Sequence, residues 1–288
     1  MNQLNLFIEL TRLKKPIGYM LLFWPCVWGL TLVYDFSNNI YLYFFYLLLF
    51  FFGSVLMRSA GCIVNDILDR KFDKQVSRTK NRPIASGKIS IKFGLFYAAF
   101  LCGLAFLVLI NFNYFTILIA LASMPLAFTY PLMKRYTYWP QLFLGITFNY
   151  GIILGWTSIS GNLEIIPIIF YFGAIFWTLG YDTIYGYQDI KDDEIIGLKS
   201  TSIKFKGTAK LFLITCYLIL ILSFILGGYL MEFKLYYFLF LIIPAVQLFL
   251  YQIKTFDLNN SSMCLKIFKS NNYFGLIIFF NILIGKIL

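Results

Sequence analysis

The chain has 288 residues, of which 60% are hydrophobic, 20% aromatic and only 13% charged, and its formal net charge is +11. A soluble domain averages about 25% charged residues, and no soluble core of this size can bury so much apolar surface. The composition excludes a soluble enzyme, a secreted module and a disordered protein. Because histidine is absent, a histidine base and a histidine-ligated metal or haem are excluded as well.

Nine apolar runs follow one another along the chain, each long enough to cross a bilayer, which takes roughly 20 helical residues. They do not alternate between polar and apolar residues as the strands of a membrane barrel do, so an all-α polytopic membrane protein is predicted. The predicted spans are 18–34, 40–60, 93–111, 114–133, 140–158, 164–184, 211–230, 235–252 and 271–287.

The basic residues predict how these spans are oriented. If the N-terminus is cytoplasmic, all of the 24 Lys and Arg residues except Lys234 and Lys286 fall at cytoplasmic span ends or loops. This positive-inside pattern predicts an external C-terminus. The +11 charge is then mainly a topology signal, and no nucleic-acid partner is expected.

A first acidic motif follows the second span and contains Asn65, Asp66, Asp69 and Asp73. If the helix continues through it, at about 100° per residue, these four side chains form one stripe. The motif therefore predicts a row of oxygen ligands at the cytoplasmic end of the span.

A second acidic motif, of the same design, follows the sixth span. It contains Asp182, Tyr185, Asp189, Asp192 and Asp193, and a continuous helix would again place them in one stripe. Tyr185, Asp189 and Asp193 repeat the spacing of Asn65, Asp69 and Asp73, 120 residues later. The shared spacing indicates an internal duplication.

Carboxylates stacked on one helix face repel one another, so such a row is typical of a cation site. Carboxylate and amide oxygens, completed by water and phosphate, suit Mg²⁺. A solvated acidic helix end is the alternative, and the matched pair of motifs on one side of the membrane disfavours it.

Basic residues follow the first motif closely, above all Arg78 and Arg82. They could form plain ion pairs or contact inner-leaflet lipid. They could also enclose a diphosphate together with the metals. A diphosphate site at the mouth of an apolar bundle predicts an isoprenyl diphosphate substrate. Departure of its diphosphate leaves an allylic cation, for which a phenol ring is an acceptor that needs no histidine base.

The residues around both motifs resemble the UbiA family of intramembrane aromatic prenyltransferases. The strings that carry the resemblance start at Arg58 (RSAGCIVNDILDRKFDKQVSRTKNRP) and at Tyr181 (YDTIYGYQDIKDDEIIGLKST), with weaker support near Arg12 and Lys134. The residue sequences of these strings are similar to those of the 4-hydroxybenzoate polyprenyltransferases of ubiquinone biosynthesis. The resemblance implies a single domain over 1–288, with about nine helices around a central cavity, in the bacterial inner membrane with its active site on the cytoplasmic side.

The resemblance also implies roles for particular residues. Two Mg²⁺ ions would be held by Asn65, Asp66, Asp69, Asp73, Asp182, Asp189, Asp192 and Asp193, with Asp69, Asp73, Asp189 and Asp193 essential for catalysis. The diphosphate of the polyprenyl donor would contact Arg70, Arg78, Lys80 and Arg82. The carboxylate and phenol of 4-hydroxybenzoate would contact Arg135, Asp189, Arg12 or Arg58.

Three other functions remain open from sequence. Within the family, the acceptor could be a naphthoate, homogentisate or haem. A membrane transporter would place its acids near the middle of the bilayer, whereas these acids cluster at span ends. A polytopic scaffold without chemistry would leave the paired motifs unexplained.

Overall fold

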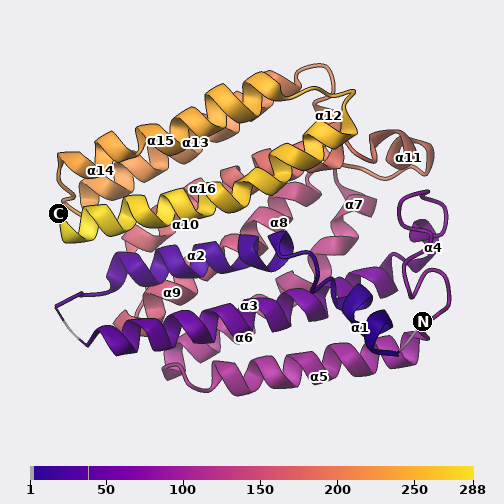
Figure 1. Ribbon diagram of the computed structural model, residues 1–288, viewed down its shortest axis with the longest axis horizontal. Helices are drawn as coiled ribbons and strands as arrows, with labels where there is room; N and C mark the ends of the chain where they lie inside the picture. Colours follow the sequence, from indigo (N-terminus) through magenta and orange to yellow (C-terminus); the bar gives the residue numbers. More distant parts are fainter. Residues whose placement is uncertain (1–2, 38) are drawn as a thin grey trace.

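The computed structural model describes residues 3–37 and 39–288, and all regular structure in that part of the chain is helical. Among these residues, nine long helical segments run roughly along one axis, and short helices gather at one end (Figure 1). Eight of the segments are long and apolar enough to cross a membrane; the remaining one, α2 (Ile17–Val33), has 17 residues. The prediction of an all-α protein with about nine spans is confirmed.

The spans differ from the predicted runs mainly at their ends. The helix α3 (Ile40–Leu68) and the helix α16 (Ser261–Ile287) extend well beyond the apolar runs that predicted them, because polar residues continue both helices. Besides α2, the other unbroken spans are α5 (Ile91–Leu109), α10 (Ile165–Gly186) and α13 (Ala209–Leu230).

Three spans are built from more than one helical piece. The fourth is α6 (Tyr114–Thr129), followed by η1 (Tyr130–Leu132) and α7 (Met133–Tyr136). The fifth is α8 (Pro140–Asn149) and α9 (Gly151–Ser160), and the eighth is α14 (Leu235–Phe240), α15 (Ile242–Val246) and the π-helical η2 (Gln247–Ile253). Polar caps begin several helices: Asn39, Ser90, Asn113 and Asn260 accept hydrogen bonds from the first backbone N–H groups of α3, α5, α6 and α16.

Aromatic side chains fill the core between α2, α10, α13 and α16. The rings of Trp28 and Trp177 lie 5.1 Å apart, and both are fully buried. Their indole N–H groups donate to the Gly275 carbonyl at 3.0 Å and to Asn271 Oδ1 at 2.8 Å. The polar ends of these large rings are therefore satisfied inside the bundle, as burial away from water requires.

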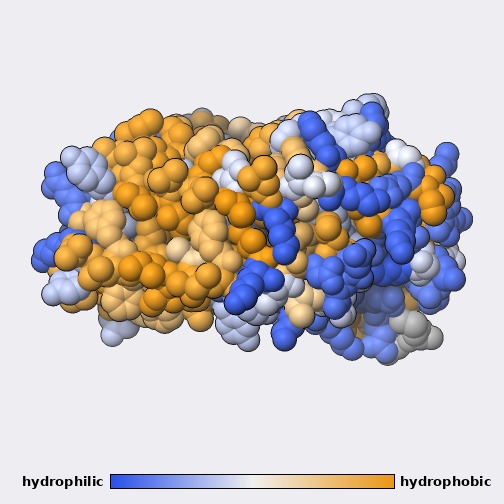
Figure 2. All heavy atoms as spheres, turned by 90° about the horizontal axis from the view of Figure 1, so that it is seen from above, coloured by the Kyte–Doolittle hydropathy of each residue, from blue (hydrophilic) through white to orange (hydrophobic). Residues whose placement is uncertain are grey.

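The outer surface divides into an apolar length and a polar end. Large apolar side chains such as Leu48, Phe100 and Leu222 are more than half exposed along the spans. Hydrophilic residues gather at the end that carries the short helices (Figure 2). The helices α1 (Gln3–Thr11), α4 (Arg70–Asp73), α11 (Ile190–Ile195) and α12 (Thr201–Lys204) lie at this end, and α16 finishes at the opposite one (Figure 1). Both acidic motifs therefore lie at the polar end.

Candidate active site

The backbone breaks within each acidic motif, so the prediction of two continuous helical stripes is wrong. The helix α3 ends at Leu68, and Asp69 turns the chain with φ −90° and ψ 2° before α4 begins. The helix α10 ends at Gly186, and Asp189 has φ −116° and ψ 8° before α11 begins. Both breaks fall at the middle acid of the shared spacing, where each carboxylate turns toward a basic side chain from another segment.

Three carboxylates of the first motif are buried together with basic partners. Asp66, Asp69 and Asp73 are only 2%, 1% and 6% exposed. Asp66 accepts a hydrogen bond from Arg12 at 2.5 Å, and Arg82 Nη1 donates to Asp66 Oδ1 at 3.1 Å and to Asp73 Oδ2 at 2.8 Å. Burial of a charge is costly unless it is paired in this way.

Arg12 reaches Asp66 from an unusual backbone conformation. Its φ is +57°, in the left-handed region that side chains rarely adopt. Such strain persists only where surrounding contacts hold it, and it is frequent at functional sites. The turn after α1 thus places this guanidinium at the first motif.

The second motif is joined to the loop that follows the first. Arg78 donates from Nε to Asp189 Oδ1 at 2.8 Å and from Nη2 to Asp189 Oδ2, a two-pronged contact. Ser77 donates to Asp192 at 3.2 Å. The two motifs, 120 residues apart in sequence, therefore face one site.

Lys134 makes a second connection between the motifs. Its Nζ donates to Asp69 Oδ2 at 2.5 Å. Its positive charge also lowers the pKa of Asp193 in the second motif, against the effect of burial. Lys134 was not among the predicted site residues; its place beside Arg135 in α7 was the only signal in the sequence. Arg135 donates to the Leu68 carbonyl at 2.7 Å and lies over the Phe72 ring, so it too packs against the first motif.

Burial raises the pKa of two carboxyls in the site. It is the main cause for Asp193, helped by the negative charge of Asp189, and brings that pKa to about 6. Burial also raises the pKa of Asp73, against the opposing charge of Arg82. Carboxyls with raised pKa values in a cleft are typical of functional sites.

The donor set suits a hard divalent cation. One nitrogen of Arg82 lies between Asp66 and Asp73, which shows that a single positive centre can bridge these two carboxylates. Among the described residues, no group of three or more Asp, Glu, His or Cys lies close enough to hold a metal by itself. The protein thus supplies part of an oxygen shell, as is common where Mg²⁺ also takes water and phosphate oxygens.

Several predicted site residues have unused polar groups. Asn65 and Lys80 make no side-chain hydrogen bond or ion pair within the described part of the chain, and the buried Nε atoms of Arg70, Arg135 and Arg58 have no hydrogen-bond partner there. Free donors beside neutralised carboxylates are suited to an anionic ligand.

A largely apolar cavity of about 210 Å³ lies inside the bundle. Its lining comes from α2, α3, α5, α6, η1, α8 and α9, and includes Arg58 and Tyr130. Arg58 lies over the Phe148 ring at 5.3 Å, and Tyr130 and Asp182 are its polar neighbours. Of the predicted acceptor-binding residues, Arg58 alone lines this cavity, whereas Arg12, Arg135 and Asp189 contact the acidic motifs. Tyr130 was missed as a site residue, although its sequence neighbourhood contributed to the family resemblance.

Comparisons with known proteins agree with this geometry. Residues 22–282 match the sequence model of the UbiA prenyltransferase family. The chain is 42% identical to 4-hydroxybenzoate geranyltransferase 2 of Lithospermum erythrorhizon over 98% of its own length and 90% of that protein. It is 41% identical to the mitochondrial 4-hydroxybenzoate polyprenyltransferase of Rattus norvegicus, covering 98% of this chain and 75% of the rat protein.

Solved structures share the fold. The apo UbiA homologue of Aeropyrum pernix K1 superposes with a TM-score of 0.77 at 22% identity, covering 93% of this chain and 97% of that one. The UbiA homologue of Archaeoglobus fulgidus bound to DMAPP and Mg²⁺ gives 0.73 at 17% identity, covering 98% and 99%.

Proposed function

The chain belongs to the UbiA prenyltransferase family, and from this premise we propose that it transfers a polyprenyl group from polyprenyl diphosphate to 4-hydroxybenzoate. The carbon attacked is the one ortho to the hydroxyl, as in ubiquinone biosynthesis. One observation carries the proposal: two carboxylate motifs, linked by Arg78 and Lys134, lie together at the polar end of a bundle that encloses an apolar cavity. The acceptor follows from the two relatives of about 40% identity, both named for 4-hydroxybenzoate.

The metal is assigned as Mg²⁺, which the Archaeoglobus relative binds with its diphosphate. The ligands of two such ions would come from Asn65, Asp66, Asp69 and Asp73 in the first motif and from Asp182, Asp189, Asp192 and Asp193 in the second. When bound, Mg²⁺ neutralises the charge that develops on the leaving diphosphate. Arg70, Arg78, Lys80 and Arg82 would donate hydrogen bonds to the phosphate oxygens.

The cavity receives the isoprenoid tail and protects the reacting carbon. As the C–O bond to the diphosphate breaks, its electron pair leaves with the diphosphate, and the prenyl carbon becomes positive. The ring faces of Phe128, Tyr130 and Phe148, which line the cavity, stabilise a cation. Apolar walls exclude the water that would otherwise capture it.

Arg58 is assigned to the carboxylate of 4-hydroxybenzoate. It lines the cavity and keeps a buried nitrogen free, and a guanidinium matches a carboxylate. The phenol then points away from Arg58, with its ortho carbon toward the prenyl cation. A carbon–carbon bond forms there, and loss of the proton from that carbon restores the aromatic ring.

The site is assigned to the cytoplasmic face of a bacterial inner membrane. The support is the hydrophilic end of the molecule (Figure 2), which carries α4 and α11 (Figure 1). The Lys and Arg residues of its loops place this end in the cytoplasm by the positive-inside rule. The rat relative is mitochondrial.

The test uses membranes that contain the protein, a polyprenyl diphosphate and one acceptor at a time. Prenylated 4-hydroxybenzoate is expected when Mg²⁺ is present, with no product after chelation by EDTA. Naphthoate and homogentisate serve as competing acceptors. Preferential prenylation of either, or metal-independent product, contradicts the proposal.

A further inference from the structure

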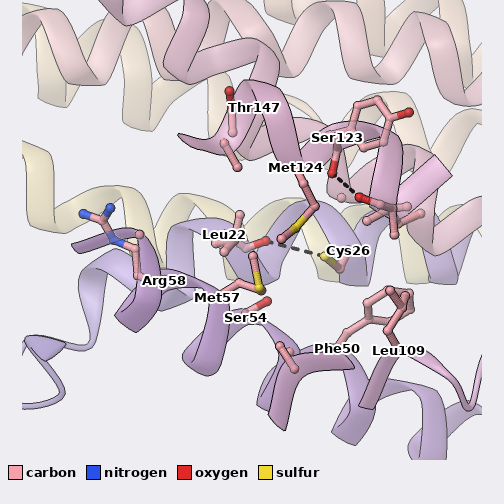
Figure 3. A pocket seen from close by; sticks show the side chains of 18 of the residues that line it. Leu22, Cys26, Phe50, Ser54, Met57, Arg58, Leu109, Ser123, Met124 and Thr147 are labelled. Carbon is pink, nitrogen blue, oxygen red and sulfur yellow. Dashed lines mark hydrogen bonds between the residues drawn. The ribbon is translucent and has the colours of Figure 1, made fainter. Parts of the chain in front are cut away.

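We call the Arg58 end of the cavity its mouth; the opposite end is lined by aromatic rings. In Figure 3 Arg58 lies at one end of the cavity, and Phe50 and Leu109 lie at the other. The Phe50 ring is 4.8 Å from that of Phe112, which in turn stacks on Tyr46 at 5.4 Å. Because Phe50 is only 7% exposed, these rings fill the space between α3 and the turn after α5.

Small residues stand directly before this aromatic end. On α3 the lining residues nearest to Phe50 toward the mouth are Gly53 and Ser54, and α5 contributes Ala105. A Cβ atom at Gly53 would have its nearest neighbour, Val108 Cγ1, at 3.9 Å. Along α3 the lining thus changes from Gly53, which leaves open space, to the large ring of Phe50, which ends it.

The side of the cavity between α5 and α6 has a different character. Phe106 and Leu121 line it, and they are 48% and 42% exposed. This side therefore borders the lipid, whereas Phe50 at the other end is buried.

We propose that Phe50 and Phe112 set the length of isoprenoid tail that the cavity encloses. This inference rests on the proposed function and extends it to the choice of donor. From Gly61 to Phe50, eleven residues of helix rise about 16 Å. An isoprene unit adds four carbon–carbon bonds of about 1.5 Å and extends a tail by about 4–5 Å. Three to four units fit above the rings, and longer tails must leave between α5 and α6.

Positions one helical turn apart on α3 differ in depth by about the length of one isoprene unit. Gly53 lies three residues, about 4.5 Å, closer to the mouth than Phe50, and Tyr46 lies four residues, about 6 Å, beyond it. The substitution Gly53→Phe should shorten the cavity by about one isoprene unit. The substitutions Phe50→Ala and Phe112→Ala should lengthen the cavity toward Tyr46.

The experiment measures kcat/KM for 4-hydroxybenzoate prenylation with all-trans donors of two to six isoprene units. Relative to wild type, Phe50→Ala and Phe112→Ala should raise the ratio of five-unit to four-unit donor by about tenfold. Gly53→Phe should lower the ratio of four-unit to two-unit donor by a similar factor. The control is Phe96→Ala on α5, a 63% exposed residue outside the cavity, which should leave the profile unchanged. The two-unit donor reports whether each variant is folded.

The inference is overturned if Gly53→Phe and either alanine variant keep the wild-type dependence of kcat/KM on donor length while they retain activity with the two-unit donor. Mg²⁺-dependent binding of the same donors is measured in parallel. If wild type binds donors without prenylating 4-hydroxybenzoate, the proposed acceptor fails, and the binding profile still decides the tail-length inference. If wild type binds no prenyl diphosphate, both fail.

Discussion

At the scale of single residues, the carboxylates of the site pair with basic side chains that are not their neighbours in sequence. Most of these bases come from distant segments, and Arg82 comes from the loop that follows the first motif. Arg12, Arg78 and Lys134 pair with Asp66, Asp189 and Asp69, respectively. Sequence spacing identified the acids, because they recur at matched intervals. It could not assign the partners, since these depend on how three loops meet at one end of the bundle.

Asp193 gives the site a pH dependence. Its pKa of about 6 lies well above that of an ordinary carboxyl, and a metal binds only the deprotonated form. As the pH falls through 6, protons compete with Mg²⁺, and the Mg²⁺ concentration needed for half-maximal activity should rise several-fold between pH 7.5 and 5.5. Titration of activity with Mg²⁺ at each pH checks this. The variant Asp193→Asn should need more Mg²⁺ at both pH values, with a smaller difference between them. An unchanged Mg²⁺ requirement in wild type contradicts the expected competition.

Arg58 should govern binding of the acceptor. The variant Arg58→Lys keeps the charge but loses the planar, two-pronged donor. Its KM for 4-hydroxybenzoate should rise about tenfold or more, while the KM for the polyprenyl diphosphate stays within about twofold. Arg135→Lys is the matched comparison, because Arg135 contacts Leu68 and Asp69 outside the cavity. If Arg135→Lys raises the acceptor KM and Arg58→Lys does not, the assignment is reversed.

At the scale of helices, the main departure from the sequence prediction is the break in each acidic motif. Nothing around Asp69 resembles a helix stop, because neither glycine nor proline is near it. The chain turns at Asp69 and at Asp189, where each carboxylate pairs with a distant base. Both breaks coincide with tertiary ion pairs, whose partners the local sequence could not show.

Close packing of α2 on α9 depends on glycine. A Cβ atom at Gly155 would lie 2.3 Å from the Cys26 carbonyl oxygen and 2.5 Å from the Leu30 nitrogen, so the two helices would have to separate. Gly155→Ala should destabilise the protein by about 1–3 kcal/mol, seen as a lower melting temperature in detergent. Gly103→Ala on α5 is the control, since a Cβ there meets no atom within 4 Å. Equal melting temperatures for the two variants would mean that this crossing is not tight.

At the scale of the whole molecule, much of the architecture follows from hydropathy and charge. The nine apolar runs became nine helical segments in the described part of the chain, and both acidic motifs lie at its basic end. The position of the cavity could not be predicted, because apolar residues that line it, such as Phe50, and those that face lipid, such as Leu48, have the same chemistry. Only packing distinguishes them.

The central proposal is that the two acidic motifs act together on one diphosphate. The direct measurement is the rate of Mg²⁺-dependent 4-hydroxybenzoate prenylation by Asp69→Asn and by Asp189→Asn, with Glu194→Gln as control. Glu194 is an exposed acid of α11 that pairs only with Lys206 among the described residues. Each aspartate variant should lose at least about a hundredfold in rate, and Glu194→Gln should keep near wild-type activity. Full activity after loss of either aspartate would contradict the claim.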